Sequence, residues 1–203
     1  MKIIFATGNK DKMVEIRQIM GDFDAEILSM KEAGINLDIV EDGTTFAENS
    51  MIKAREVAAA YKEMYEEPAI ILADDSGLVV DALNGEPGIY SARYLGEDTP
   101  YSIKNQAIID RLVGVEHKDR TARFVDAIGA VFPDGSEEVA EGTIEGFIGD
   151  RPAGCHGFGY DPIFYLESGV STAELPEEEK NAISHRGKAL SAMKQIIVER
   201  GLL

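Results

Sequence analysis

The sequence contains few cysteines and few basic residues. Its one cysteine, Cys155, excludes an internal disulfide framework and a cysteine-rich zinc site, and it fits a reducing compartment. Lys and Arg number 20 against 37 Asp and Glu, which gives a formal net charge of −17. This balance argues against a broad nucleic-acid-binding surface or an anionic-membrane anchor. A small anionic substrate remains compatible with it, because a few clustered cations outweigh a distant field.

The sequence also lacks long apolar stretches. No run approaches the roughly 18 apolar residues of a membrane span, and the run at residues 3–6 is too short for a signal peptide. We therefore expect a soluble, cytoplasmic protein. Hydrophobic residues still make up 44% of the chain, enough for a core. Because there is no repeat and no linker, we expect residues 1–203 to form one domain.

Helix and strand patterns alternate along the chain. Helices are expected from Asp11, from a capping box at residues 45–48, from Pro176, and over a last segment ending near Gly201. In the capping box, Thr45 and Glu48 would satisfy each other's backbone N–H groups.

Apolar runs at residues 3–6 and 69–73 are typical of buried strands, and the second is expected to end where two aspartates follow. Residues 124–132 and 137–144 flank a strong turn signal, which predicts a hairpin. The sequence therefore predicts an α/β fold with a mixed sheet.

The loop after the first predicted strand carries candidate phosphate ligands. Free N–H groups and the positive end of a helix suit phosphate, and a glycine lets the backbone approach closely. The loop lacks the spacing of a Walker A motif, and the alternative is an ordinary capped turn with solvated lysines. The candidates are Thr7, Gly8, Asn9, Lys10, Asp11 and Lys12.

Two adjacent acids, Asp74 and Asp75, follow the apolar run at residues 69–73. Successive side chains on an extended chain point in opposite directions, so only one of them need enter a cleft. A carboxylate in this position can bind a hard divalent cation or take a proton from water. The alternative is a turn in which the acids cap backbone N–H groups.

Three further segments carry polar or aromatic groups. On the second predicted helix, Asn49 and Lys53 share a face, near Glu48 and the loop residue Glu41, and such faces are commonly just solvated. Residues 157–162 alternate glycines with aromatics, which would either sandwich a planar base or pack under a loop. Residues 180–187 gather hydrogen-bond donors in an otherwise acidic chain.

Together these segments resemble the inosine/xanthosine triphosphate pyrophosphatase family, whose members remove non-canonical purine nucleotides. The match covers nearly the whole chain. Its six ordered blocks are residues 5–12, 45–53, 73–78, 87–94, 157–162 and 178–186.

The resemblance implies an elongated α/β fold with a long mixed sheet and two lobes around a central cleft, usually as a homodimer. It also implies Mg²⁺-dependent hydrolysis of ITP, dITP and XTP to the monophosphate and pyrophosphate. No nucleic-acid partner is implied.

By position, the resemblance assigns residues 7–12 and Lys53 to the phosphates. It makes Asp75 the catalytic acid/base and a metal ligand, Glu41 a second metal ligand, and Ser76 a substrate contact. The base and sugar pocket is assigned to Phe158, Gly159, Tyr160, Asp161, Lys180, His185 and Arg186.

The chemistry is consistent with this assignment. A triphosphate brings about four negative charges, so its site needs a metal and lysines. His185 and Arg186 would donate hydrogen bonds to the 6-oxygen of hypoxanthine or xanthine. The 6-amine of adenine is itself a donor, so adenine would be disfavoured by roughly 10- to 100-fold. Two other hypotheses are a module that binds nucleotide without turnover and a pyrophosphatase for pyrimidine or modified nucleotides.

Overall fold

A computed structural model describes residues 1–202. Six strands form one sheet in the order β2-β1-β3-β4-β5-β6. β1 pairs in parallel with β2 and with β3, whereas β6 pairs antiparallel with β5, so the predicted mixed sheet is confirmed. The strands are β1 (Lys2–Phe5), β2 (Glu26–Ser29), β3 (Ala69–Val80), β4 (Thr121–Val131), β5 (Glu137–Ile148) and β6 (Phe164–Tyr165).

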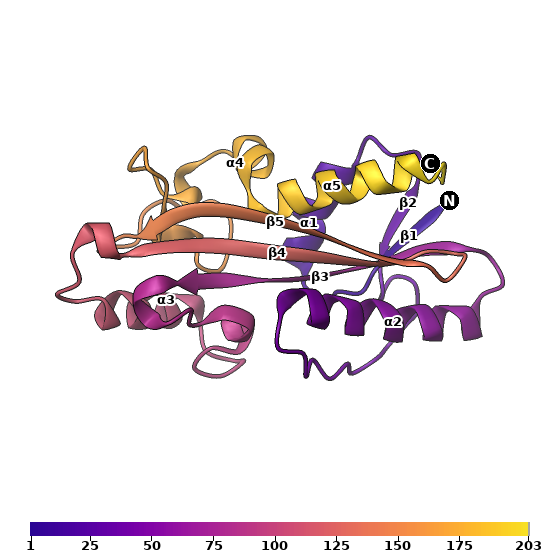
Figure 1. The fold of residues 1–203 in the computed structure, drawn as a ribbon, viewed down its shortest axis with the longest axis horizontal. Helices are drawn as coiled ribbons and strands as arrows, with labels where there is room; N and C mark the ends of the chain where they lie inside the picture. The colour runs from indigo at the N-terminus through magenta and orange to yellow at the C-terminus, as the bar shows by residue number, and fades with distance from the viewer. Residues whose placement is uncertain (203) are drawn as a thin grey trace. The chain divides into compact units, whose positions relative to one another are not determined.

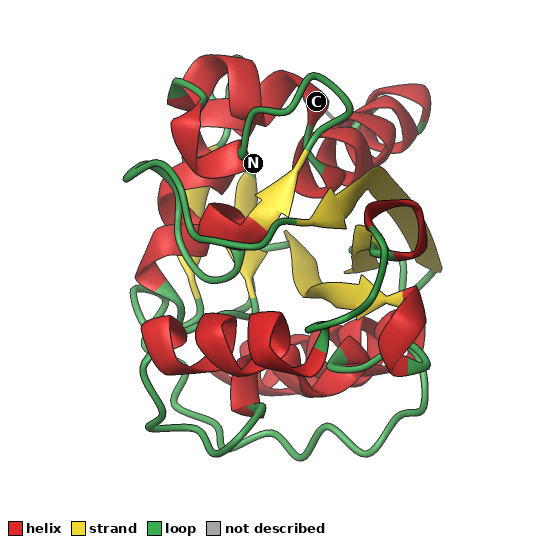
Figure 2. Cartoon of the chain, turned by 90° about the vertical axis from the view of Figure 1, so that its left-hand side faces the viewer, coloured by secondary structure: helices red, strands yellow, loops and turns green. Residues whose placement is uncertain are grey.

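Five α-helices accompany these strands in the described chain, and Figure 2 shows helices above and below the strands. The predicted α/β class is therefore confirmed. The helices are α1 (Lys10–Met20), α2 (Phe46–Met64), α3 (Tyr101–Arg111), α4 (Glu177–Ile183) and α5 (His185–Glu199). None of the helices within residues 1–202 is both long enough and apolar enough to cross a bilayer.

The chain divides into two compact units. Unit 1 comprises residues 1–75, 126–142 and 186–202, and unit 2 comprises residues 76–125 and 143–185. The strands β3, β4 and β5 contribute residues to both units.

In unit 1, the strands bury side chains on both faces. Ile3, Phe5, Ile70 and Leu72 pack in one cluster with apolar residues of α1 and α5. The intervening side chains of β1 and β3, such as Ile71, pack in a second cluster with α2. Figure 1 shows α5 and α2 on opposite sides of these strands. This alternation is the reason for the continuous apolar runs in the sequence, because both faces are covered.

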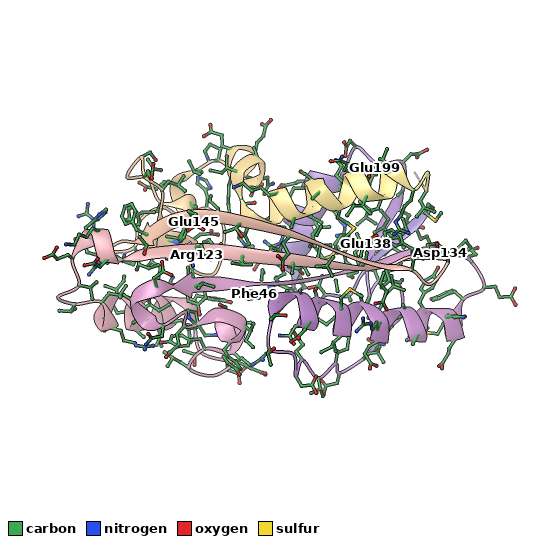
Figure 3. All side chains as sticks on the ribbon, in the orientation of Figure 1. Phe46, Arg123, Asp134, Glu138, Glu145 and Glu199 are labelled. Carbon is green, nitrogen blue, oxygen red and sulfur yellow. The ribbon has the colours of Figure 1, made fainter. Side chains whose placement is uncertain are left out.

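Unit 2 has its own core, in which Leu78 and Val80 of β3 pack with Ile108 of α3. Its surface carries charged cross-strand contacts. Arg123 of β4 and Glu145 of β5 lie beside each other (Figure 3), with 3.0 Å between Nε and Oε1. Such exposed pairs contribute little to stability.

Two local predictions were wrong in detail. β3 does not end before the two aspartates but continues through them to Val80. At the start of α2, the Thr45 hydroxyl accepts the N–H of Glu48 as expected, but the Glu48 carboxylate accepts from the N–H and hydroxyl of Thr44. The reciprocal capping bond therefore goes to the residue before the N-cap. The hairpin of β4 and β5 and the helices ending near Gly201 and beginning after Pro176 are confirmed.

Candidate functional site

Asp74 and Asp75 lie in the middle of β3 and are both buried, with 1% and 8% of their surface exposed. Because side chains alternate along a strand, the two carboxylates have different neighbours. Asp74 contacts Lys12 of α1 and Arg186 of α5, and Asp75 contacts Lys53 of α2. The strand can continue through two acids because cations from three helices balance their charges.

Beside Asp75, one lysine joins two carboxylates. Lys53 Nζ lies 2.8 Å from Glu41 Oε2 and 3.3 Å from Asp75 Oδ1. Burial works against the charge of Lys53, but the surrounding carboxylates outweigh it and raise the pKa of Lys53. Burial also raises the pKa of Asp75, and the charges of Lys53 and Lys12 offset this only in part. Asp75 is therefore shifted toward the range in which a carboxylate can exchange a proton.

Beside Asp74, Arg186 is enclosed by three carboxylates. Its Nη1 donates to Glu15, its Nη2 lies 3.1 Å from Asp74 Oδ2, and its Nε lies 3.7 Å from Asp126 Oδ2. Lys12 Nζ also contacts Asp74 Oδ2, at 2.8 Å. The guanidinium is almost fully buried, as are all the carboxylates around it.

These contacts set the charges of the two aspartates that face Arg186. Burial opposes the charge of Asp74, but Lys12, Arg186 and Lys53 together hold the pKa of Asp74 well below its usual range. Burial and the nearby charge of Asp74 instead raise the pKa of Asp126 to about 7. Asp74 is therefore a permanent anion, whereas Asp126 can hold a proton near neutral pH.

The cluster in unit 1 contains more carboxylates than cations. Its cations are Lys12, Lys53 and Arg186, and its carboxylates are Glu15, Glu41, Asp74, Asp75 and Asp126. Carboxylates engage both Lys12 and Lys53 in this structure, so the assignment of these lysines to the phosphates stays a prediction.

Several carboxylate oxygens of the cluster are buried without a hydrogen-bond donor in residues 1–202. They are Oδ1 of Asp74, Oδ2 of Asp75 and both oxygens of Asp126. A buried carboxylate oxygen without a donor is costly, so such groups commonly face an ion or water. Asp75 and Glu41 both offer oxygen ligands next to Lys53, and hard cations such as Mg²⁺ prefer oxygen. The residues fit such an ion.

Within the described residues, no three His, Cys, Asp or Glu side chains are arranged so that they could coordinate one metal ion. Mg²⁺ does not require one, because it is commonly bound by one or two carboxylates together with substrate phosphates and water. The pair of Asp75 and Glu41 matches this pattern in number.

The loop between β1 and α1 is a capped turn that also leaves two donors open. Asn9 Oδ1 accepts the N–H groups of Asp11 and Lys12, at 2.9 and 3.2 Å, and Thr7 Oγ1 accepts the N–H of Asn9 at 3.2 Å. In residues 1–202 no protein acceptor faces the N–H groups of Gly8 and Lys10. The loop is therefore a capped turn, and phosphate binding by its open N–H groups stays a prediction.

In unit 2, Asp161 and Lys180 pair with each other. Asp161 Oδ2 accepts from Lys180 Nζ at 2.6 Å and from the N–H of Phe158 at 2.8 Å, and Asp161 Oδ1 accepts from Thr172 Oγ1 at 2.9 Å. Lys180 Nζ also lies 5.1 Å from the centre of the Phe158 ring. These contacts shape the loop at residues 157–161.

The aromatic residues of this loop have different surroundings. Tyr160 is buried, and its hydroxyl donates to the backbone oxygen of Ser91 at 2.8 Å. Its ring meets Tyr101 edge to face, so Tyr160 offers no open stacking surface and packs under the loop. Phe158 and Gly159 are only partly buried, as is Ser76 of β3.

His185 is buried at the start of α5, where its ring stacks on Phe124 with 4.8 Å between the ring centres. It lines a cavity of about 10 Å³, roughly the room of one water. The cavity is also lined by Phe124, Ile144, Asp161, Thr172, Lys180, Ile183 and Ser184.

The predicted site residues thus fall into two groups. Unit 1 brings together Lys12, Lys53, Glu41, Asp75 and Arg186. Unit 2 brings together Phe158, Tyr160, Asp161, Lys180 and His185, most of them on one loop and the segment that packs on it.

Sequence analysis missed two members of the cluster, Glu15 and Asp126. The sequence could have pointed to Asp126, because a charged residue inside the apolar run of β4 is unusual. It gave no indication of Glu15, because a glutamate is an ordinary residue on the polar face of an amphipathic helix.

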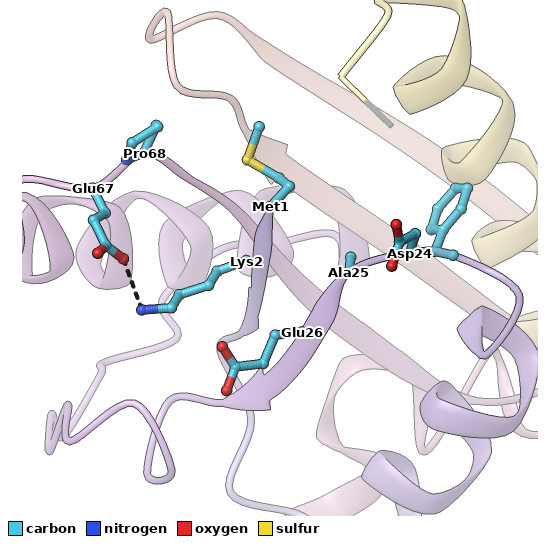
Figure 4. Close-up of a pocket in the computed structure, with 8 residues that line it drawn as sticks. Met1, Lys2, Asp24, Ala25, Glu26, Glu67 and Pro68 are labelled. Atoms are coloured by element: carbon cyan, nitrogen blue, oxygen red, sulfur yellow. Dashed lines mark hydrogen bonds and ion pairs between the residues drawn. The ribbon is translucent and has the colours of Figure 1, made fainter.

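A larger, open cavity of about 670 Å³ lies elsewhere in unit 1, at the amino ends of β1 and β2 (Figure 4). Its side chains include Lys2 and Glu67, which form an ion pair. None of the predicted site residues lines this cavity, so the clustered carboxylates remain the better candidate.

Comparisons with known proteins support the resemblance found in the sequence. The family model described as the Ham1 family matches residues 3–196. Curated proteins named dITP/XTP pyrophosphatase are similar over nearly their whole length. One from Clostridium perfringens is 47% identical over 95% of both chains, and one from Thermoanaerobacter sp. is 46% identical over 98% of both.

Solved structures show the same fold. The Ham1 protein of Staphylococcus aureus superposes with a TM-score of 0.85 and is 36% identical, covering 98% of this chain and 100% of that one. A HAM1 protein from Coxiella burnetii gives a TM-score of 0.84 at 38% identity, covering 98% and 99% of the two chains.

Proposed function

This chain belongs to the Ham1 family, and on that premise we propose that it is a nucleoside triphosphate pyrophosphatase. It hydrolyses dITP, XTP and ITP to the monophosphate and pyrophosphate, with Mg²⁺ as cofactor. The names of its relatives support dITP and XTP as substrates, and the 6-oxo group that ITP shares with them supports ITP. The geometry of unit 1 supports the chemistry.

The observation that carries the proposal is the setting of Asp75. It is a buried carboxylate with an unpartnered oxygen and a raised pKa, beside Lys53 and Glu41. In hydrolysis, a water oxygen bonds to the α-phosphorus, the bond from that phosphorus to the bridging oxygen breaks, and pyrophosphate leaves. Asp75 orients the water and takes its proton, since a carboxylate with a raised pKa is a better base.

Asp75 and Glu41 would hold Mg²⁺, because both offer oxygens at one lysine and the cluster has an excess of carboxylates. When bound, the ion would neutralise phosphate charge and make pyrophosphate a better leaving group. Lys53 supplies a positive charge whose raised pKa keeps it protonated at neutral pH.

The phosphates are bound by the loop before α1. The open N–H groups of Gly8 and Lys10 point to anion binding at a helix start, and the exposed side chain of Lys10 adds charge. Asn9 and Thr7 hold the loop in this shape through their hydrogen bonds. Lys12 keeps Asp74 charged and acts on phosphate only as a nearby cation.

In unit 2, His185 and the loop at residues 157–161 recognise the base. His185 would donate a hydrogen bond to the 6-oxygen of the base. In adenine the same N–H would meet the 6-amine, which is also a donor, so no hydrogen bond would form. The ion pair of Asp161 and Lys180 sets the loop shape, and Phe158 supplies the aromatic face. A direct base contact by Arg186 stays a prediction, because its guanidinium is held by carboxylates of unit 1 in this structure.

Pyrophosphate release over a panel of ITP, XTP, dITP, GTP and ATP, with Mg²⁺ and with the ion removed by chelation, tests the proposal. We expect release from the first three only when Mg²⁺ is present. Tight nucleotide binding without any release would instead indicate a nucleotide-sensing module. Faster release from pyrimidine or modified nucleotides would assign a different substrate class.

We also propose that the protein works as a cytoplasmic homodimer. The family resemblance supports the dimer, and the lone, exposed Cys155 fits a reducing compartment. Light scattering coupled to gel filtration measures the mass in solution, and a single-chain mass of 22.1 kDa would contradict the dimer.

A further inference from the structure

Asn49 is fully buried on α2, one helical turn before Lys53, and it has no role in the proposed hydrolysis. It lies in the first turns of α2 with no surface exposed. Its Oδ1 accepts the backbone N–H of Gly43, at 2.9 Å. Its Nδ2 is buried without a hydrogen-bond partner in residues 1–202, so the bond from Gly43 is the contact that ties this amide to the loop.

The loop segment before α2 is clamped at its carboxyl end. A Cβ added to Gly43 would lie 2.7 Å from Asn49 Oδ1 and 2.8 Å from Glu48 Cβ, so only glycine allows this approach. The next residue, Thr44, donates its N–H and its hydroxyl to Glu48 Oε2, at 2.6 and 2.7 Å. Residues 43 and 44 are therefore fixed to the helix.

Glu41 stands two residues before this clamp, in a stretch without helix or strand. Its carboxylate reaches Lys53, which lies one helical turn after Asn49 on the same face. The position of Glu41 thus depends on two anchors, an ion pair at its side chain and the Asn49–Gly43 hydrogen bond near its backbone.

We infer that Asn49 is a positioning residue that holds Glu41 in place for the metal ion, acting through the backbone of Gly43. The inference rests on the proposed function, because it assumes Glu41 as a metal ligand. Without the Asn49 anchor, binding the ion must also order the loop, and this conformational entropy weakens metal binding. The base, Asp75, lies on a different element and keeps its place.

The test compares Asn49→Ala with the wild type. We expect the Mg²⁺ concentration for half-maximal pyrophosphate release to rise roughly 3- to 10-fold, the value of one buried hydrogen bond. At saturating Mg²⁺, kcat stays close to that of the wild type. Binding of Mn²⁺ alone, followed by electron paramagnetic resonance, weakens by a similar factor. Hydrogen exchange at the Gly43 amide becomes faster.

Two further variants separate positioning from general destabilisation. Gly43→Ala pushes the loop away while Asn49 stays intact, so it reproduces the weaker Mg²⁺ dependence even if Asn49→Ala fails to fold. Thr45→Ala removes only the N-cap bond of α2. It lowers the melting temperature but leaves the Mg²⁺ dependence unchanged.

An unchanged Mg²⁺ dependence in both Asn49→Ala and Gly43→Ala, with faster exchange at residue 43, overturns the inference. A fall in kcat without a change in Mg²⁺ dependence overturns it as well, and so does a wild type that binds no Mn²⁺. The proposed function fails in a different way, through the absence of pyrophosphate release by the wild type on every nucleotide of the panel.

Discussion

Asp74 and Asp75 are the same residue in adjacent positions, yet their surroundings move their pKa values in opposite directions. Two cations face Asp74 directly and keep it charged, whereas burial dominates at Asp75 and favours its protonated form. One aspartate is thus a fixed anion that anchors helices, and the other can exchange a proton. The partners of each carboxylate decide its chemistry, and these partners are distant in the sequence.

Replacement of Asp75 by Asn is expected to lower turnover by about 10²- to 10⁴-fold, because the amide cannot take a proton from water. The fold should persist, since Asn keeps the size of the side chain. Pyrophosphate release and far-ultraviolet circular dichroism measure the two effects. Glu141→Gln, an exposed change on β5, is the control. A variant at Asp75 with turnover near that of the control would refute its role as base.

Asp126 gives a prediction for pH. Its pKa is raised from the ordinary 3.8 to about 7, so between these values the folded protein holds a proton that the unfolded chain has lost. The contribution of Asp126 to the free energy of unfolding therefore falls as pH rises from 3.8 to about 7, and then stays level.

Asp126→Asn has no such proton. Its melting temperature, relative to that of the wild type, should rise steadily over this pH range. Thermal unfolding of both proteins at a series of pH values measures the difference, and a difference that does not vary with pH would be inconsistent with a proton on Asp126.

At the scale of elements, β3 shows where sequence reasoning reaches its limit. Its apolar half, the hairpin of β4 and β5, and the capped helix starts follow from local patterns and were predicted. The second half of β3 was not, because two adjacent acids normally indicate a turn. Lys12, Lys53 and Arg186 come from three separate helices and reduce the cost of keeping these acids in a strand. Only the folded chain brings them there.

The contact between β4 and α2 provides a prediction at this scale. A Cβ on Gly129 would lie 2.8 Å from Met51 Sδ and 3.0 Å from the backbone N of Met51. Gly129→Ala should therefore lower the free energy of unfolding by about 1–3 kcal/mol through overpacking. Urea denaturation measures it.

Gly8→Ala is the matched control, since a Cβ there meets nothing within 4 Å. We expect that change to stay within about 0.5 kcal/mol of the wild type. Equal effects of the two alanines would show that close approach at Gly129 is not limiting.

At the scale of the whole molecule, the predicted site residues divide between two units with different proposed roles, and the blocks at residues 73–78 and 178–186 contribute residues to both units. Unit 1 holds the carboxylates and lysines proposed for the phosphates, and unit 2 holds the groups proposed for the base. The sequence identified most members of both groups through the resemblance. It did not show that the cations of unit 1 are already paired, because pairing depends on side-chain geometry.

This division predicts that base preference and metal dependence can be changed separately. His185→Ala should reduce the ratio of kcat/KM for ITP to that for ATP by roughly 10- to 100-fold, the cost of one lost and unsatisfied pairing. Its Mg²⁺ dependence should stay as in the wild type. Steady-state kinetics with both nucleotides over a Mg²⁺ series measure the two properties, and an unchanged ratio would remove His185 from base recognition.

The continuity of β3 also constrains how this chain can change length. Insertion of a single residue before Ala73 would turn every following side chain to the opposite face. Asp74 would occupy the position of Asp75, and Asp75 would move on to the face contacted by Lys12 and Arg186. A change of two residues would keep each side chain on its face but displace both carboxylates by about 7 Å along the strand, away from their cations. The length of this strand upstream of the acids is therefore constrained by the ion pairs as well as by the alternation of faces.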